Sequence, residues 1–430
     1  MRRELMKKQI NLLEAISIGI GGMVGGGIFA VLGLAVTLAK GSTPIAFLLA
    51  GAIALMTAYS YVHLTKAYPS NGGTVRFINE GFGVNLFSGS LNNLLWISYI
   101  IMLSLYASAF GSYAPNLFKI TGTSLDFHIY ASAIVIFSTF INYYSIRLVG
   151  LVESYAVIIK LVILLGFVLL GVYGLFTNPN VVQLSPKYWE NPIQLFAGGM
   201  VIFVAYEGFE LIANAALNIV NPQKNIAKAY YISVIFVIAL YIIIAIVTVG
   251  SLPFEQIAKA QDYALAQAAK PFLGHLGFVV ITIAALISTF SAINASIYGG
   301  GQVNYDIAEE KELPKGFLHQ FSHQPIGLLI TSVATLVLVN ALQLSVISTT
   351  GSIGFLIIFG MVNLAAFRLS QQIHARKWLT GLAAIACFVA TGVLIIQQYQ
   401  AQPLGIYVAM LIMVACVGLE YLNLQLQKRK

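Results

Sequence analysis

Long runs of apolar residues alternate with short polar segments along nearly the whole chain. Twelve of these runs reach the roughly 18 apolar residues that a helix needs to cross a bilayer. They centre near residues 25, 55, 100, 137, 164, 203, 240, 288, 334, 357, 387 and 413. The pattern predicts an all-α integral membrane protein with twelve transmembrane helices, whose connecting loops are too short to form a separate soluble domain.

Two of the predicted helices, the first and the sixth, are interrupted. The first contains the segment GIGGMVGGGIF at 19–29, and the sixth contains AYEGFE at 205–210. Glycine permits unusual backbone angles, and unwound backbone inside a membrane persists only where protein buries it or it lines a cavity. Breaks at matching places in two halves of a chain mark the substrate site of transporters. We therefore expect one transmembrane domain with an inverted repeat, 11–176 against 193–370, followed by two helices in 378–424.

Composition and charge support this topology. Hydrophobic residues make up 59% of the chain and charged residues 9%, whereas soluble domains carry about 25% charged residues. With the N-terminus inside, seventeen of the 23 Lys and Arg fall on the inner side and one, Lys160, within a span. The five on the outer side are Lys40, Lys119, Lys187, Lys259 and Lys270. This asymmetry follows the positive-inside rule and predicts that both termini are cytoplasmic.

Several classes of chemistry have no support in the sequence. The two cysteines lie in apolar runs, which argues against a disulfide framework. His319 and His323 are four residues apart without acidic or cysteine companions, so we expect no metal site. Neither a phosphate-binding Gly-Lys-Ser/Thr loop nor a nucleophile–base pattern occurs. We expect no cofactor, no ATP, no nucleic acid and no enzymatic activity.

Four segments resemble signatures of the amino acid–polyamine–organocation superfamily. They are LLEAISIGIGGMVGGGIF at 12–29, AYPSNGGTVRFINEGFG at 67–83, FVAYEGFELIANAALNIVNPQKNIAKA at 203–229 and STFSAINASIYGGGQVNYDIAEEKELP at 288–314. The resemblance, closest in type to bacterial and archaeal proton-coupled members, implies a LeuT-type fold with a 5+5 inverted repeat plus two helices. It also implies broken helices 1 and 6 and secondary amino acid transport.

The glycine-rich first break is one half of the predicted substrate site. Unpaired N–H groups around Gly25, Gly26 and Gly27, with the positive end of the following half-helix, suit an α-carboxylate. The resemblance gives this segment the same role, and we include the adjoining Met23 and Val24. The alternative is that the small residues serve close helix packing.

The second break offers the opposite polarity. A half-helix ending near Ala205 would expose carbonyl oxygens to a substrate ammonium, with the contacts at Tyr206 and Glu207 beside Gly208. Tyr206 and Phe209 are candidate aromatic lids, with helix packing as the alternative. The third apolar run contains Trp96, Tyr99 and Tyr106. Our default interpretation is that these side chains pack in the core, although one of them could close the substrate pocket.

Three ionisable residues lie inside predicted spans. A charge at the bilayer centre costs about 2.5–3.5 kcal/mol on insertion scales, so each requires a partner, water or neutralisation. Glu207 could recognise a substrate side chain or carry a proton, and Glu210 could carry a proton. For both, the alternative is structural hydrogen bonding.

The third residue, Lys160, lies about three turns inside the fifth predicted helix. The resemblance implies that a lysine here replaces the sodium ion of sodium-coupled relatives. Its expected partners are the carbonyls near Gly21 and Gly22 and the hydroxyls of Ser288 or Ser291. The alternative is a lysine that snorkels toward the membrane surface.

These observations predict a secondary active transporter of the plasma or inner membrane. Its predicted partners are an amino acid substrate, protons and the lipid bilayer. We expect proton-coupled symport of L-amino acids by alternating access. An amino acid or amine exchanger with the same site is the first alternative. A membrane sensor that binds an amino acid without transporting it is the second.

Overall fold

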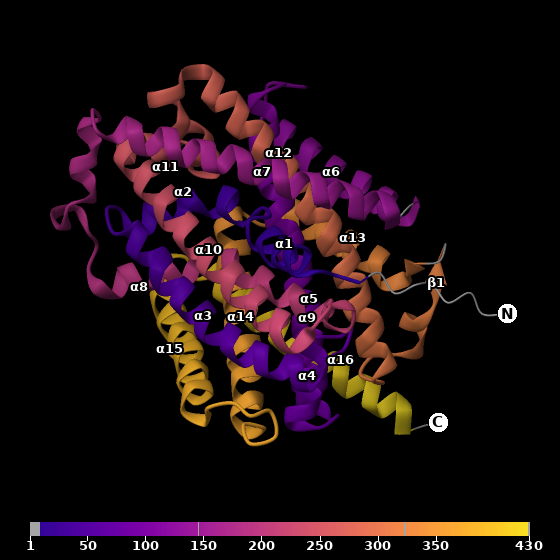
Figure 1. Ribbon diagram of the computed structural model, residues 1–430. Coiled ribbons are helices and arrows are strands. Elements are labelled where there is room, and N and C mark those ends of the chain that lie inside the picture. The colour runs from indigo at the N-terminus through magenta and orange to yellow at the C-terminus, as the bar shows by residue number, and fades with distance from the viewer. Residues whose placement is uncertain (1–8, 145, 322–323, 429–430) are drawn as a thin grey trace.

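The computed structural model describes residues 9–144, 146–321 and 324–428 and is a bundle of helices (Figure 1). The predicted cytoplasmic residues 1–8 and 429–430 lie outside this range. The longer helices are α1 (Leu12–Met23), α2 (Gly27–Ala39), α3 (Thr43–Ala67), α5 (Leu86–Tyr113), α6 (Leu125–Tyr144), α7 (Ile146–Leu175), α8 (Pro192–Val201), α10 (Pro222–Ser251), α12 (Ala264–Glu309), α13 (Ile326–Ala341), α14 (Leu344–Arg368), α15 (Lys377–Ala401) and α16 (Leu404–Lys428).

Short elements connect these helices. They are α4 (Thr74–Phe82), α9 (Leu211–Asn214), α11 (Phe254–Lys259), the 3-10 helices η1 (Ala114–Asn116), η2 (Pro179–Leu184), η3 (Pro186–Tyr188), η4 (Phe203–Glu210), η5 (Ala216–Asn218), η6 (Gln261–Tyr263) and η7 (Lys315–Leu318), and the strands β1 (Gln320–Phe321) and β2 (Gln324–Pro325). The two strands pair antiparallel, with Gln320 opposite Pro325.

The described residues contain nine helices that are long and apolar enough to cross a membrane. Two further pairs, α1 with α2 and α8 with the segment Phe203–Asn214, pass the same test together and each bend by 44°. Counting each pair as one span gives eleven, and the apolar helix α13 has 16 residues. The all-α membrane architecture and the two interrupted spans are confirmed, whereas a count of twelve requires α13 as a span.

Helices at the centre of the bundle are more deeply buried than helices at its periphery. In α5 the most apolar stretch is 89% buried, whereas in α16 it is 28% buried. Figure 1 accordingly places α5 among other helices and α15 and α16 toward the edges of the view. The polar residues of α5 therefore face protein rather than lipid, which is the arrangement that membrane-embedded polar groups require.

The sixth span departs from the sequence-based prediction in its boundary. Helix α8 ends at Val201, four residues before the predicted end at Ala205, and η4 follows it. The hydroxyls of Ser348 and Ser352 on α14 each donate to the Val201 carbonyl at 2.8 Å. These bonds satisfy a carbonyl of the last helical turn, so the helix can end there without leaving the group unpaired.

A further feature concerns residues 251–271, which lie between the predicted spans centred near 240 and 288. The structure places α11, η6 and the first turns of α12 there. Helix α12 continues through Pro271 and contains a kink at Gly274, whose φ of 64° is in the region that favours glycine.

A buried carboxylate joins three elements near the end of α12 that we predict to be cytoplasmic. Glu312, in the loop after α12, accepts hydrogen bonds from Ser88 Oγ at 3.0 Å, Asn92 Nδ2 at 2.5 Å and Asn79 Nδ2 at 3.4 Å. Burial raises the pKa of the Glu312 carboxyl, and these hydrogen bonds oppose the shift. Glu312 thus fixes this loop to α4 and α5.

We expect Glu312 to make the stability of the protein depend on pH. Because its folded-state pKa is raised, the folded protein holds this proton more tightly than the unfolded chain. The stabilisation is therefore present at low pH and lost as the pH rises through the raised pKa. The melting temperature of the purified protein should fall over this interval, and Glu312→Gln should reduce the slope. Glu309→Gln, at an exposed neighbour, is the control; equal slopes in wild type and Glu312→Gln would contradict the prediction.

Candidate functional site

The first break leaves a set of backbone donors at the start of α2. Helix α1 ends at Met23 and α2 begins at Gly27. Within the described part of the chain, the N–H groups of Gly25, Gly26 and Gly27 make no hydrogen bond. They lie at the positive end of α2, which is an arrangement that binds anions. The structure therefore provides the donors that the sequence predicts for a carboxylate.

The carbonyl oxygens of the same break, by contrast, have side-chain partners. Tyr241 Oη on α10 donates to the Met23 carbonyl at 2.6 Å. Ser288 Oγ on α12 donates to the Val24 carbonyl at 2.8 Å and also contacts the Gly25 carbonyl. Inside a membrane such partners replace water, so the unwound turn is stable with its carbonyls bonded and its amides free.

The backbones of the two breaks are in direct contact. A Cβ atom on Gly22 would lie 2.6 Å from the carbonyl oxygen of Gly208, and a Cβ on Gly208 would overlap the backbone of α1. Tyr241 Oη also reaches the Ala205 carbonyl at 3.3 Å. At Gly22 and Gly208 the structure thus supports the packing interpretation of the glycines.

Lys160 is fully buried in α7, and its Nζ donates to the Gly21 carbonyl at 3.0 Å. This contact is the one that the sequence analysis expects, and complete burial excludes a lysine that snorkels to the membrane surface. The other predicted partners are divided: Ser288 bonds to the carbonyls of the first break, whereas Ser291 lines a cavity beside it. Lys160 therefore fixes the last turn of α1 to α7.

The two glutamates of η4 face different surroundings. Glu207 Oε1 accepts a hydrogen bond from Tyr106 Oη on α5 at 3.2 Å. Glu210 Oε2 accepts from Tyr61 Oη on α3 at 3.3 Å and from Thr74 Oγ1 on α4 at 3.0 Å. Both carboxylates are buried, one toward the central cavity and the other toward the α3–α4 connection.

A small cavity of about 10 Å³ lies between the first break, η4, α5 and α12. Its lining residues are Gly21, Gly22, Tyr99, Tyr106, Glu207, Leu211, Ser291, Ala292, Ala295 and Ser296. A volume of roughly 10–15 Å³ holds one water, whereas ligand pockets measure roughly 300–1,000 Å³. The structure is closed around this cavity, which is too small for a ligand much larger than a water molecule.

Most residues predicted to bind substrate lie in the packed core beside the small cavity and do not line it. Glu207 lines the cavity, as do Gly21, Gly22 and Ser291, which the sequence analysis assigns to coupling. The remaining predicted binding residues are buried in the neighbouring core: Met23, Val24, Gly25, Gly26, Gly27, Ala205, Tyr206, Gly208 and Phe209.

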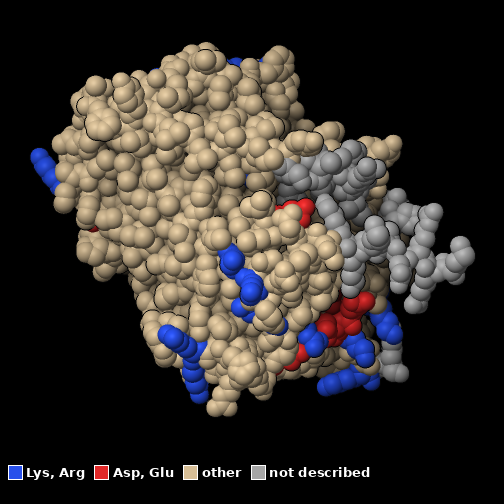
Figure 2. All heavy atoms as spheres, in the orientation of Figure 1, with Lys and Arg blue, Asp and Glu red and all other residues tan. Residues whose placement is uncertain are grey.

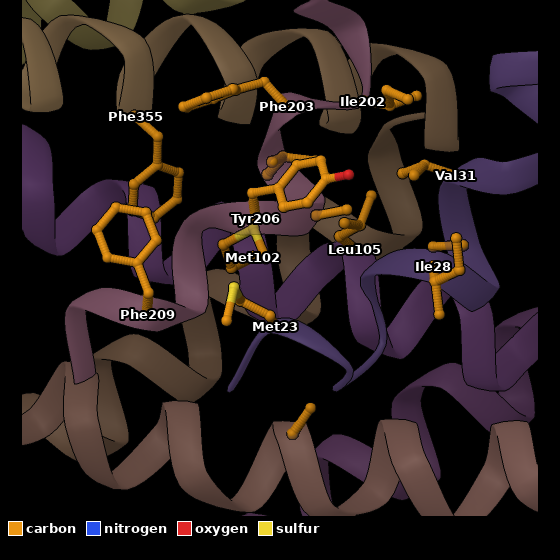
Figure 3. Packing of buried hydrophobic residues seen from close by; sticks show 14 of the residues in the cluster. Met23, Ile28, Val31, Met102, Leu105, Ile202, Phe203, Tyr206, Phe209 and Phe355 are labelled. Carbon is orange, nitrogen blue, oxygen red and sulfur yellow. The ribbon is translucent and has the colours of Figure 1, made fainter. Parts of the chain in front are cut away.

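The two residues predicted as aromatic lids, Tyr206 and Phe209, do not line the small cavity. Tyr206 is buried with its hydroxyl donating to the Phe47 carbonyl at 2.9 Å, and the Phe209 ring packs edge-on against Tyr61 with centroids 5.4 Å apart. Figure 3 shows Tyr206 within the apolar cluster, above Met23 and Met102. The rings that line the cavity are Tyr99 and Tyr106 of α5, for which the sequence analysis gives packing as the default and closure of the pocket by one of them as the alternative. Their seven-residue spacing places both on one helix face and was the available signal.

A larger cavity of about 470 Å³ adjoins the small one on the side of the N-terminal end of α1. Leu211 and Ala295 line both cavities, so these two residues separate them. On the opposite side, the backbone of Gln261 in η6 packs so closely on Gly33 of α2 that a Cβ atom would not fit. The closed site is therefore nearest to opening toward the end that we predict to be cytoplasmic.

Comparison with known protein families identifies the family to which this chain belongs. The sequence profile described as amino acid permease matches residues 10–417. The chain belongs to the amino acid permease family. This family is part of the amino acid–polyamine–organocation superfamily, so the protein is a multi-pass membrane transporter rather than an enzyme.

Several permease relatives are similar over most of their length. An uncharacterized protein of Methanocaldococcus jannaschii is 35% identical, over 92% of this chain and 90% of the relative. The inner membrane transport protein YbaT of Escherichia coli is 36% identical, over 86% of this chain and 85% of the relative. The serine/threonine exchanger SteT of Bacillus subtilis is 27% identical, over 74% and 72% of the two chains.

The contact between the two breaks gives a stability prediction. Gly208→Ala introduces a Cβ into the backbone of α1, and overpacking of this kind costs about 1–3 kcal/mol. We expect a lower melting temperature of the purified permease, measured in detergent. Gly166→Ala on α7 is the matched control, because no atom lies within 4 Å of a Cβ built there. An equal effect of the two substitutions would refute the proposed close contact.

Proposed function

We propose that this permease carries out proton-coupled symport of L-amino acids by alternating access. The observation that carries the proposal is the hydrogen bond from the buried Lys160 ammonium to the Gly21 carbonyl at the end of α1. It joins an ionisable group to the segment that borders the cavity, so a change of its charge acts directly on that segment.

The substrate site that we propose lies between the two breaks. The free amides of Gly25, Gly26 and Gly27 bind the α-carboxylate, and backbone carbonyls between Ala205 and Glu207 accept from the ammonium. The side chain of the amino acid occupies the cavity beside Tyr99 and Tyr106. Support for this placement comes from the unpaired amides and from the cavity that adjoins both broken helices.

Protonation of Lys160 is the proposed link to the proton gradient. A charged lysine holds the last turn of α1 against α7 through the Gly21 carbonyl, whereas a neutral amine donates more weakly. Loss of the proton therefore loosens α1 beside the larger cavity and favours opening on that side. Since substrate and proton then act on one conformational equilibrium, each changes the affinity for the other.

Glu207 and Glu210 are proposed as further proton carriers. Glu207 faces the cavity and Glu210 faces the α3–α4 connection, so their protonation would alter contacts on both sides of η4. Ser288 and Ser291 on α12 complete the coupling region, since Ser288 bonds to the first break and Ser291 borders the cavity.

The membrane arrangement that we infer has twelve spans with α13 included. Residues 11–176 and 193–370 form the two repeats, residues 378–424 form the last two spans, and both termini are cytoplasmic. The basic residues at the helix ends support this orientation. The similarity to YbaT, an inner membrane transport protein of Escherichia coli, supports placement in the inner, or plasma, membrane.

Amino acid exchange through the same site is a second candidate. It is favoured by the similarity to SteT, a serine/threonine exchanger of Bacillus subtilis. An exchanger requires a counter-substrate on the opposite side and no proton gradient, which makes the two functions separable by experiment.

Uptake by purified protein in liposomes tests the proposal. With an imposed inward proton gradient and no sodium, we expect accumulation of labelled amino acids from a mixture. Lys160→Ala should reduce this accumulation at least about tenfold, since removal of a buried charge-assisted hydrogen bond costs about 1.5–3 kcal/mol.

Lys119→Ala is the matched control, because Lys119 is exposed in the loop before α6. Rapid uptake that requires unlabelled amino acid in the lumen and ignores the gradient would replace symport with exchange. Gradient-driven accumulation that Lys160→Ala leaves intact would retain symport and remove the lysine from the coupling mechanism.

A further inference from the structure

The ends of α3, α10 and α15 that we predict to be cytoplasmic carry a group of basic residues. Five basic residues lie there: Lys66, Lys224, Lys228, Arg376 and Lys377. The segments 43–67, 222–251 and 369–401 contain no Asp or Glu. Across the described part of the chain, the salt bridges involve other residues, so none of these five side chains is held in a close ion pair.

The centre of this surface is an ordered set of polar and aromatic contacts. Tyr59 Oη on α3 accepts a hydrogen bond from the backbone N–H of Arg376 at 2.8 Å. The rings of Tyr59 and His63 lie 4.6 Å apart, and His63 Nδ1 is 3.1 Å from the Ile373 carbonyl. Thr65 Oγ1 on α3 lies 3.2 Å from Tyr230 Oη on α10. These contacts hold the basic ends of the three helices close to the rings of Tyr59 and His63.

An apolar face of α3 extends from Tyr59 toward the middle of the membrane. Leu48, Ala52, Leu55 and Tyr59 follow each other at three- or four-residue spacing and are exposed or partly exposed. Helix α10 packs on one side of α3, through Ile238 against Gly51. Helix α15 packs on another side, where Thr57 Oγ1 is 3.6 Å from Cys387 Sγ. The face is thus a strip between two flanking helices.

Exposed apolar side chains continue on the flanking helices. Ile235 on α10 is 53% exposed, Ile385 on α15 is 61% exposed, and Trp378 beside Lys377 is 63% exposed. Aromatic residues near basic residues are typical of the membrane–water interface. In Figure 2, groups of basic side chains lie on the lower part of the face that carries these helices, separated by uncharged surface.

We propose that this surface binds an anionic phospholipid. Its phosphate and headgroup contact Lys66, Lys228 and Arg376, and one acyl chain lies along the exposed face of α3. Juxtamembrane basic clusters attract the anionic lipids of the cytoplasmic leaflet, and guanidinium groups match phosphate geometry. The apolar strip distinguishes a lipid from a soluble phosphate, because a free anion would gain nothing from it. The site lies apart from the transport cavity and does not depend on the proposed transport mechanism.

Native mass spectrometry of the purified full-length permease tests this site. Phosphatidylglycerol and phosphatidylcholine with identical acyl chains are added in equal amounts, and the retained lipid is counted. We expect phosphatidylglycerol to be retained several-fold more, and the triple variant Lys66→Gln, Lys228→Gln, Arg376→Gln to lower its retention at least about tenfold.

Two further variants separate a local site from general charge and from misfolding. Lys311→Gln, Lys315→Gln, Lys428→Gln removes the same charge from exposed positions on the same predicted side and should retain the lipid. Lys66→Arg, Lys228→Arg, Arg376→Lys keeps the charge and should also retain it.

Three results would overturn the proposal. The first is equal retention of the two lipids by the wild type. The second is an equal loss in the two glutamine triples. The third is displacement of phosphatidylglycerol by millimolar inorganic phosphate, which would identify a soluble-anion site.

Discussion

Backbone groups that leave a helix inside a membrane need partners, because the bilayer core contains no water to bond them. This permease meets that constraint at both breaks with side chains from other helices. Tyr241 and Ser288 bond to carbonyls of the first break, and Ser348 and Ser352 bond to the Val201 carbonyl where α8 ends. Within the described residues, the amides of Gly25, Gly26 and Gly27 at the start of α2 make no hydrogen bond, in contrast to these carbonyls.

The same constraint explains why the charged residues are located where they are. Lys160 compensates the carbonyl of Gly21 in the last part of α1, and Glu207 and Glu210 each accept from tyrosine hydroxyls. Each of these contacts joins a broken helix to an unbroken one. The polar network therefore positions the breaks and links them to α3, α5 and α7, so a local change of charge alters how the bundle packs.

Much of this arrangement follows from local signals in the sequence. Glycines in an apolar run predict a break, whereas the contact of Lys160 with Gly21 was expected from the resemblance to proton-coupled relatives. The end of α8 was not predictable in this way, because it depends on serines of α14 that are distant in the chain. Tyr206 and Tyr106 likewise could not be distinguished by type, since the direction of each ring is set by tertiary packing.

Tyr241 has a single hydroxyl hydrogen but lies near two carbonyls, at 2.6 Å from Met23 and 3.3 Å from Ala205. The shorter distance indicates that the hydrogen is directed mainly to Met23. The Ala205 carbonyl lies in the 3-10 helix η4, whose backbone bonds run from residue i to residue i+3, and the hydroxyl adds a further contact to it. One hydroxyl thus touches the backbone of both interrupted spans, so a displacement of α10 shifts the two breaks together.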